Sequence, residues 1–192
     1  EEIMVGYTSG WLSASRNMMV TFVVLSLVMI LMIAPVFSGE YGGVDKIILA
    51  SRYGKTKCGM AKVAAALLTA LTVTALVAVV NLGTAFALYG GDGLDSSILF
   101  SPVDFAEGGI PFNITCGELL GYQILLAFTG AVSVTGITLL LSALCRGPLV
   151  TFAASAALHL LPALLPVTEA SPLFRWMVLT PFYQFLCSAI LS

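Results

Sequence analysis

The most constraining feature of the sequence is a set of long apolar runs that contain no charged side chain. Three of them, 18–37, 63–88 and 119–144, are long enough to cross a bilayer as helices, which takes about 20 residues. A shorter run follows at 148–166, and a fifth at 176–191 is cut off by the end of the chain. Because a helix satisfies its own backbone hydrogen bonds where water is absent, the pattern predicts an all-α polytopic membrane bundle.

The composition agrees with this class. Hydrophobic residues make up 59% of the chain and charged residues only 9%, against about 25% charged residues in a soluble domain. The chain begins with Glu1 and stops inside an apolar run. We therefore expect an internal piece of a longer protein that lacks terminal spans, folded as a single transmembrane domain over 1–192.

The charges alternate between the connections. The connection 38–62 holds five of the eight cations, and the tight turn 145–148 carries Arg146, whereas 89–118 holds acidic residues and no Lys or Arg. By the positive-inside rule, 38–62 is cytoplasmic, while 89–118 and the N-terminal segment are extracellular, which predicts a multi-pass plasma-membrane protein. Arg16 is the discordant cation, and the neighbouring Trp11 is typical of an interfacial aromatic belt.

The basic connection also contains a helical pattern. Residues 44–53 place Val44, Ile47, Ile48 and Ser51 on one face by i, i+3, i+4, i+7 spacing, and Gly54 follows as a terminator. Such a helix can lie on the bilayer surface or dock into a groove of a soluble partner. Retention of the loop by its positive charge is the simpler alternative.

This connection resembles the first cytoplasmic loop of the permease subunits of type-2 ABC transporters. In that family an apolar span ends in Phe, and Glu, Gly, a short apolar helix, Ser or Thr, a basic residue and a final Lys follow. The matching residues are Phe37, Glu40, Gly43, Ile47–Leu49, Ser51, Lys55 and Lys62. The order of basic inner loop, long outer loop, tight inner turn and Pro-bearing span is similar too, although the family has six spans and its basic residue before the last Lys is often Arg.

The resemblance implies a permease subunit of an ATP-driven exporter that is not itself an enzyme. It implies contact with a separate ABC ATPase, which would bind ATP and Mg, and pairing with a second, identical or related permease in the lipid bilayer. No cofactor in this chain and no nucleic-acid partner are expected. The implied ATPase-coupling residues are Glu40, Tyr41, Gly43, Asp45, Lys46, Ile47, Ile48, Arg52, Lys55 and Lys62.

The residues themselves offer little catalytic chemistry. There is one histidine and no P-loop, HExxH or GxSxG pattern, so neither a catalytic nor a metal site is expected. Cys116 and Cys187 either form an outer disulfide or serve as small apolar residues. The glycines of 90–95 favour a turn over a calcium loop. A scaffold or channel-like protein without an ATPase remains the alternative function, and a membrane-embedded enzyme is less favoured.

Polar and small residues inside the spans predict helix contacts. Asn81 and His159 either line a substrate path or form interhelical hydrogen bonds. Pro35 is a candidate flex point in the first span. Small residues recur every fourth position, which favours close packing within the chain over a dimer seam. These rows are Ala66, Ala70, Thr74 and Ala78; Ala127, Ala131 and Thr135; and Ala153 and Ala157.

Overall fold

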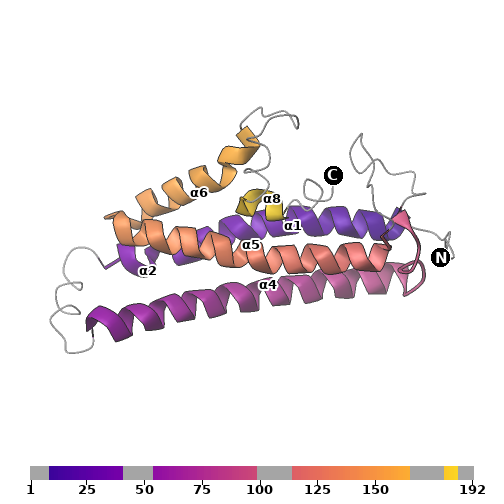
Figure 1. Cartoon of the computed structure of the whole chain (residues 1–192), viewed down its shortest axis with the longest axis horizontal. Helices are drawn as coiled ribbons and strands as arrows, with labels where there is room; N and C mark the ends of the chain where they lie inside the picture. Colours follow the sequence, from indigo (N-terminus) through magenta and orange to yellow (C-terminus); the bar gives the residue numbers. More distant parts are fainter. Residues whose placement is uncertain (1–8, 41–53, 99–113, 165–179, 186–192) are drawn as a thin grey trace.

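The computed structural model describes residues 9–40, 54–98, 114–164 and 180–185, and all regular elements in these ranges are helical (Figure 1). They are α1 (Ser9–Ile33), α2 (Pro35–Ser38), η1 (Gly54–Cys58, a π-helical turn), α4 (Gly59–Tyr89), α5 (Cys116–Leu144), α6 (Pro148–Leu164) and α8 (Pro181–Phe185).

Three helical stretches are long and apolar enough to cross a membrane, namely Gly10–Ser38, Thr56–Tyr89 and Cys116–Leu144. They contain the three long predicted spans, so the prediction of a helical protein with membrane-spanning segments is confirmed at this level. The first stretch begins earlier than predicted, because α1 starts at Ser9 and so includes the exposed Arg16. The run 148–166 forms only the shorter helix α6, and of the run 176–191 the structure describes only α8 and the residue before it.

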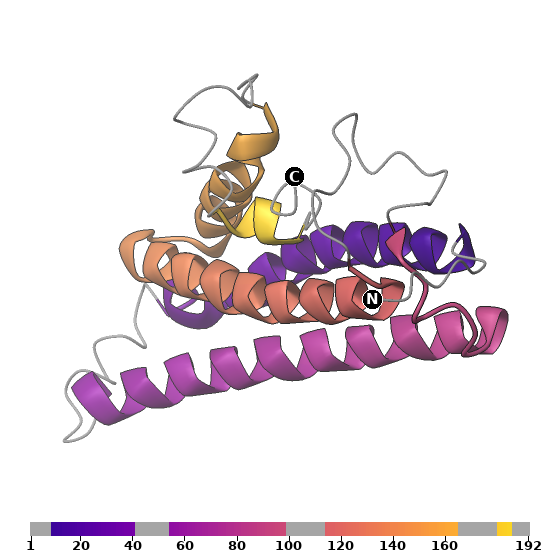
Figure 2. The same cartoon turned by 45° about the vertical axis from the view of Figure 1, so that its right-hand side comes forward.

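The three long helices run side by side with alternating direction, and α6 crosses them at a steep angle (Figures 1 and 2). Helix α5 is central, because it packs against α1, α4, α6 and α8. The end of α2, the start of α4 and the α5–α6 turn share one end of the bundle. Lys62 and Arg146 therefore lie at the end opposite Asp95 and Glu118, and we call these the basic end and the acidic end.

Two of the predicted small-residue rows form the helix contacts. Ala66, Ala70, Thr74 and Ala78 are all buried on α4, and Ala127, Ala131 and Thr135 are all buried on α5. Because these side chains are short, the helix backbones approach closely without a large apolar side chain between them. The opposite face of α4, which includes Leu76 and Val79, is exposed and would contact lipid or a partner.

The third row behaves differently. Ala153 and Ala157 lie on the exposed side of α6, so the prediction of packing within the chain is wrong for them. The buried row on α6 is Thr151, Ser155 and His159, which follow the same four-residue spacing. Helix α6 thus turns its polar side chains inward and its methyl groups outward, which is the arrangement expected where the surroundings are lipid.

The first spanning stretch is interrupted at Ala34, next to Pro35. Ser142 of α5 supports this break, because its hydroxyl donates to the Ala34 carbonyl over 2.7 Å and accepts the backbone N–H groups of Phe37 and Ser38 over 3.0 Å each. A proline removes one helical donor and disturbs the adjacent hydrogen bonds. A side chain from a neighbouring helix therefore satisfies the backbone at the predicted flex point.

The acidic end is fastened by backbone hydrogen bonds. Thr115 and Glu118 form a capping box at the start of α5, and the Gly117 N–H donates to the Leu94 carbonyl over 2.9 Å. Gly90 and Gly93 have φ values of 72° and 89°, which favour glycine. Residues 90–95 therefore form part of a turn that is tied to α5.

Trp11 does not belong to an exposed belt. It is 1% exposed, its indole N–H donates to the Asp92 carbonyl over 2.8 Å, and its ring meets Phe86 edge-on with centroids 5.1 Å apart. The interfacial-belt interpretation of Trp11 is wrong, because a buried indole finds its hydrogen-bond partner inside the protein.

Candidate functional site

The two ends of the predicted coupling loop meet at the basic end. Glu40, which follows α2, forms an ion pair with Lys62 in the second turn of α4. The Lys62 ammonium group also lies 5.4 Å from the centroid of the Phe37 ring, within the range of a cation–π contact. Phe37, Glu40 and Lys62 are three of the residues on which the resemblance to a coupling loop was based, and they form one cluster, here called the loop-base cluster.

The loop-base cluster is only partly covered by protein. The side chains of Lys62 and Glu40 are 21% and 29% exposed. Beside the cluster, an apolar groove of about 600 Å³ lies between Phe37 and the first turns of α4, and its wall includes Thr56, Met60 and Val63. The described part of the loop therefore combines an accessible ion pair with an apolar surface.

The structure does not test the coupling role of the other predicted residues. Seven of them lie outside the described residues, and Lys55 is described only as backbone within η1. The seven are Tyr41, Gly43, Asp45, Lys46, Ile47, Ile48 and Arg52.

Asn81 and His159, the predicted path residues, lie in different surroundings. Asn81 is half-buried on α4, and its side-chain amide donates to the Val77 carbonyl of the same helix over 2.9 Å. His159 is 6% exposed and lies inside the bundle, where its ring packs edge-on against Phe182 and Phe185. The structure does not bring these two residues together, because they lie on α4 and α6, which are not among the helix pairs that pack closely.

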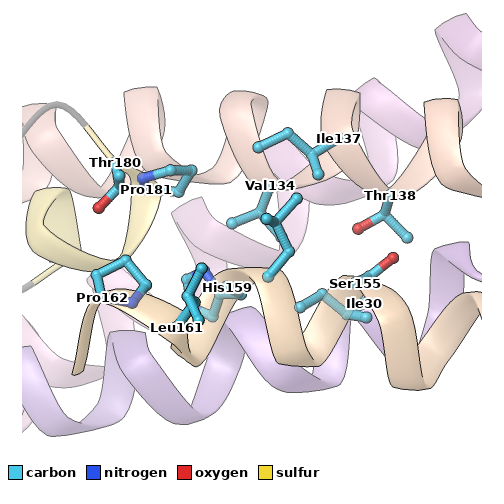
Figure 3. Close-up of a pocket in the computed structure, with 11 residues that line it drawn as sticks. Ile30, Val134, Ile137, Thr138, Ser155, His159, Leu161, Pro162, Thr180 and Pro181 are labelled. Atoms are coloured by element: carbon cyan, nitrogen blue, oxygen red, sulfur yellow. The ribbon is translucent and has the colours of Figure 1, made fainter. Parts of the chain in front are cut away.

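His159 lines a cavity of about 290 Å³ between α1, α5, α6 and α8 (Figure 3). Most of the wall is apolar, and it includes Ile30 of α1, Val134 of α5 and Pro162 of α6. Thr138, Ser155 and His159 also line it. Their atoms Thr138 Oγ1, Ser155 Oγ and His159 Nδ1 are buried without a hydrogen-bond partner, which is costly unless something else fills that role.

A hydrogen bond to α1 fixes the orientation of the imidazole. Ser26 Oγ lies 2.7 Å from His159 Nε2 and 2.6 Å from the Val23 carbonyl oxygen. A carbonyl can only accept, so the single Ser26 proton points to Val23 and His159 Nε2 is the donor. In the neutral ring, Nδ1 is then a bare acceptor.

The hydroxyls of Thr138 and Ser155 differ from most other Ser and Thr hydroxyls of this bundle in their hydrogen bonding. Hydroxyls at Thr74, Ser38 and Thr151, among others, donate to the backbone carbonyl four residues earlier in the chain. Thr138 and Ser155 form no such bond. In Figure 3 the Ser155 hydroxyl extends from α6 toward the α5 side of the pocket, where Thr138 lies.

Sequence reasoning singled out His159 and missed Ser26, Thr138 and Ser155. The spacing of Thr151, Ser155 and His159 was a usable signal, since three polar residues on one face of an apolar helix predict an inward-facing stripe. The sequence carries no comparable signal for Ser26, which is one hydroxyl in a long apolar run.

The structure adds little to the other candidate sites. Cys116 is a buried free thiol, and Cys187 lies outside the described ranges. Within those ranges, no group of three or more His, Cys, Asp or Glu side chains is placed to hold a metal ion.

Comparison with known proteins gave no match: no family model and no curated protein match this sequence, and no solved structure matches the fold.

Proposed function

We propose that this chain is a permease subunit of an ATP-driven exporter of the type-2 ABC class. It would form part of a membrane path together with a second permease subunit, identical or related, in the plasma membrane. A separate ATPase chain would bind ATP and Mg and would contact the cytoplasmic connection 38–62. The scaffold or channel-like function without an ATPase is the competing proposal.

The loop-base cluster is the observation that carries this proposal. A coupling loop must transfer force to the helices on both sides, so its two ends have to be held together. An ion pair between Glu40 and Lys62 does this, and the contact of Lys62 with Phe37 adds the end of the first span. A loop that only retained the protein by charge would need cations but no cluster at its base.

The mechanism that we propose follows from this geometry. When the ATPase subunits close on ATP, they would press on residues 41–53. The load would reach α2 through Glu40 and α4 through Lys62. Because α2 follows the break at Ala34, it would turn relative to α1 more easily than a continuous helix would.

The experiment targets the apolar face of the predicted coupling helix. Ile48→Asp would remove an anchor worth roughly 1.5–3 kcal/mol when buried and would place a charge in the groove of the ATPase. We expect loss of co-purification with the candidate ATPase and loss of transport-coupled hydrolysis, while insertion in the membrane persists because the cations are unchanged. Lys55→Gln serves as the matched control with a milder effect, since a rim charge contributes about 0–1 kcal/mol.

The same experiment distinguishes the two proposals. If Ile48→Asp retains the ATPase at wild-type yield and leaves transport unchanged, the coupling function is contradicted. Retention of the loop by charge, as in a scaffold or channel-like protein, would then be the better account.

A further inference from the structure

We propose that the cavity at His159 is a binding site for a small, neutral, largely apolar molecule that carries one hydrogen-bond donor. This inference concerns the interior of one chain. It does not depend on the coupling loop or on an ATPase.

The size and wall of the cavity define the body of the ligand. At about 290 Å³, the cavity is at the lower end of the range for small-molecule sites, which begins at about 300 Å³. None of the described residues that line the cavity is Lys, Arg, Asp or Glu, so they offer no partner to a charged ligand. An uncharged, compact molecule that dissolves in the bilayer is the class that fits.

The polar atoms define how the ligand is recognised. His159 Nδ1 offers an acceptor, because the contacts of Ser26 assign the ring proton to Nε2. Ser155 Oγ and Thr138 Oγ1 offer hydroxyls that can donate or accept. All three residues are more than nine-tenths buried. A ligand with an O–H or N–H group would donate to the imidazole and accept from a hydroxyl, whereas a hydrocarbon of equal size would leave these groups unpaired.

The cavity also has a device that holds the imidazole in place. The Nε2 bond to Ser26 connects α6 to α1, and Phe182 and Phe185 of α8 pack against the ring edge-on. Phe185 in turn fits against Gly130, where an added Cβ would lie 3.0 Å from the Phe185 ring. The acceptor is therefore preorganised, which lowers the entropic cost of binding.

The test uses the fact that His159 is the only histidine in the sequence. The full chain, carried on a tag without histidine, is labelled with ¹⁵N-histidine and placed in lipid nanodiscs without any ATPase. The Nδ1 resonance is followed during titration with 1-naphthol and, separately, with 1-methoxynaphthalene, which has the same rings but no donor. We expect 1-naphthol to move the resonance saturably, and to bind roughly threefold to tenfold tighter than 1-methoxynaphthalene.

Two variants locate the effect. Ser155→Ala should weaken the binding of both probes, because it deletes a hydroxyl that can donate to the oxygen of either one, whereas the preference for 1-naphthol, which rests on the acceptor His159 Nδ1, should remain. Thr135→Val should leave both affinities unchanged, because the Thr135 hydroxyl is equally buried and unpartnered but is not among the described residues that line the cavity.

Three results would overturn the proposal. They are equal binding of the two probes, a shift that never saturates and so reports partitioning into lipid, and affinities for both probes that are unchanged in Ser155→Ala. An Nδ1 resonance that is hydrogen-bonded before titration and insensitive to both probes would mean that the cavity holds water, and it would also reject the site. None of these outcomes bears on the coupling loop, so failure here leaves the proposed function standing.

Discussion

Lys62 reaches across the base of the connection 38–62 to pair with the carboxylate of Glu40. Its ammonium group lies 5.4 Å from the centroid of the Phe37 ring, so one cation contacts both the last turn of α2 and Glu40, two residues past its end. The two ends of this connection are therefore in contact, although they lie far apart in the sequence. The contribution of the pair is nevertheless limited by its partial exposure, since such pairs contribute about 0–1 kcal/mol.

Charge reversal tests this pair. Glu40→Lys and Lys62→Glu should each lower the thermal unfolding temperature in detergent, because each places like charges together. The double variant should recover most of the loss. Recovery should be incomplete, because a carboxylate at position 62 cannot replace the contact with Phe37, a kind of contact worth about 0.5–1 kcal/mol at exposed sites. Arg146→Glu is the control for charge at the same end, and additive effects of the two reversals would contradict the pair.

Labelling of single cysteines tests the arrangement of the ends. Thr56 precedes α4 and Asp95 follows it, so these two exposed residues lie at opposite ends of a 31-residue helix. In a background without native cysteines, Asp95→Cys should react with an impermeant maleimide from outside, and Thr56→Cys only after the cells are opened, as the charge pattern predicts. Reaction of both positions from the same side would contradict a membrane-spanning α4.

Ser142→Ala tests the support of the break near Pro35. The substitution leaves the backbone N–H groups of Phe37 and Ser38 without the Ser142 acceptor. Loss of partners for buried donors costs about 1–3 kcal/mol, so we expect a clear drop in thermal stability. Ser133→Ala on the same helix is the control, because the Ser133 hydroxyl bonds only to the Thr129 carbonyl and is near the surface. Equal effects of both changes would mean that Ser142 has no special role.

Substitution of the two predicted path residues should give unequal results. His159→Ala removes the bond to Ser26 and the ring contacts with Phe182 and Phe185, so a loss of about 2–5 kcal/mol is expected from the cavity alone. Asn81→Ala removes one bond to its own helix and should change stability by about 0.5 kcal/mol or less. Thermal unfolding of both variants measures the difference. A transport defect in a fully stable His159→Ala protein would instead indicate a direct role in a path.

Gly10→Ala tests the packing at the acidic end. A Cβ at Gly10 would lie 2.5 Å from Cδ1 of Tyr89, so the Tyr89 ring would have to move, which would disturb its contact with Trp11 at a centroid distance of 6.3 Å. We expect a loss of about 1–3 kcal/mol, as for other overpacked sites. Gly136→Ala is the control, because a Cβ there meets nothing within 4 Å and alanine is the better helix former. Equal stability of the two variants would show that Tyr89 yields freely.

The sequence predicted that 18–37, 63–88 and 119–144 lie in long helices, and it predicted which face of α4 and α5 would be buried. Both predictions rest on features that apply inside a lipid bilayer. The length of an apolar run shows whether it can span the bilayer, and the small-residue rows at 66–78 and 127–135 show where helices pack closely.

The face of α6 could not be predicted from small residues. Ala153 and Ala157 have the same spacing as the buried alanines, but lipid gives no penalty for exposing a methyl group, so a short row has no preferred side. The polar residues decide the face, because Ser155 and His159 would be costly against hydrocarbon. The cavity could not be predicted either, because it depends on how α1, α5, α6 and α8 pack together. Nothing in the sequence around Ser26 indicates that its hydroxyl bonds to His159.

Helix α4 is held in the bundle by different contacts from those that hold α1, α5 and α6. Ser15 and Gln123 connect α1 to α5 over 2.6 Å, and Ser26 and His159 connect α1 to α6. The described side-chain hydrogen bonds of α4, by contrast, all end on α4 itself. Along its length, α4 contacts the bundle through the short side chains of Ala66, Ala70, Thr74 and Ala78. Its longer side chains meet other elements at its two ends, where Lys62 pairs with Glu40 and Phe86 packs against Trp11. The position of α4 along the bundle axis is therefore fixed mainly by these two end contacts.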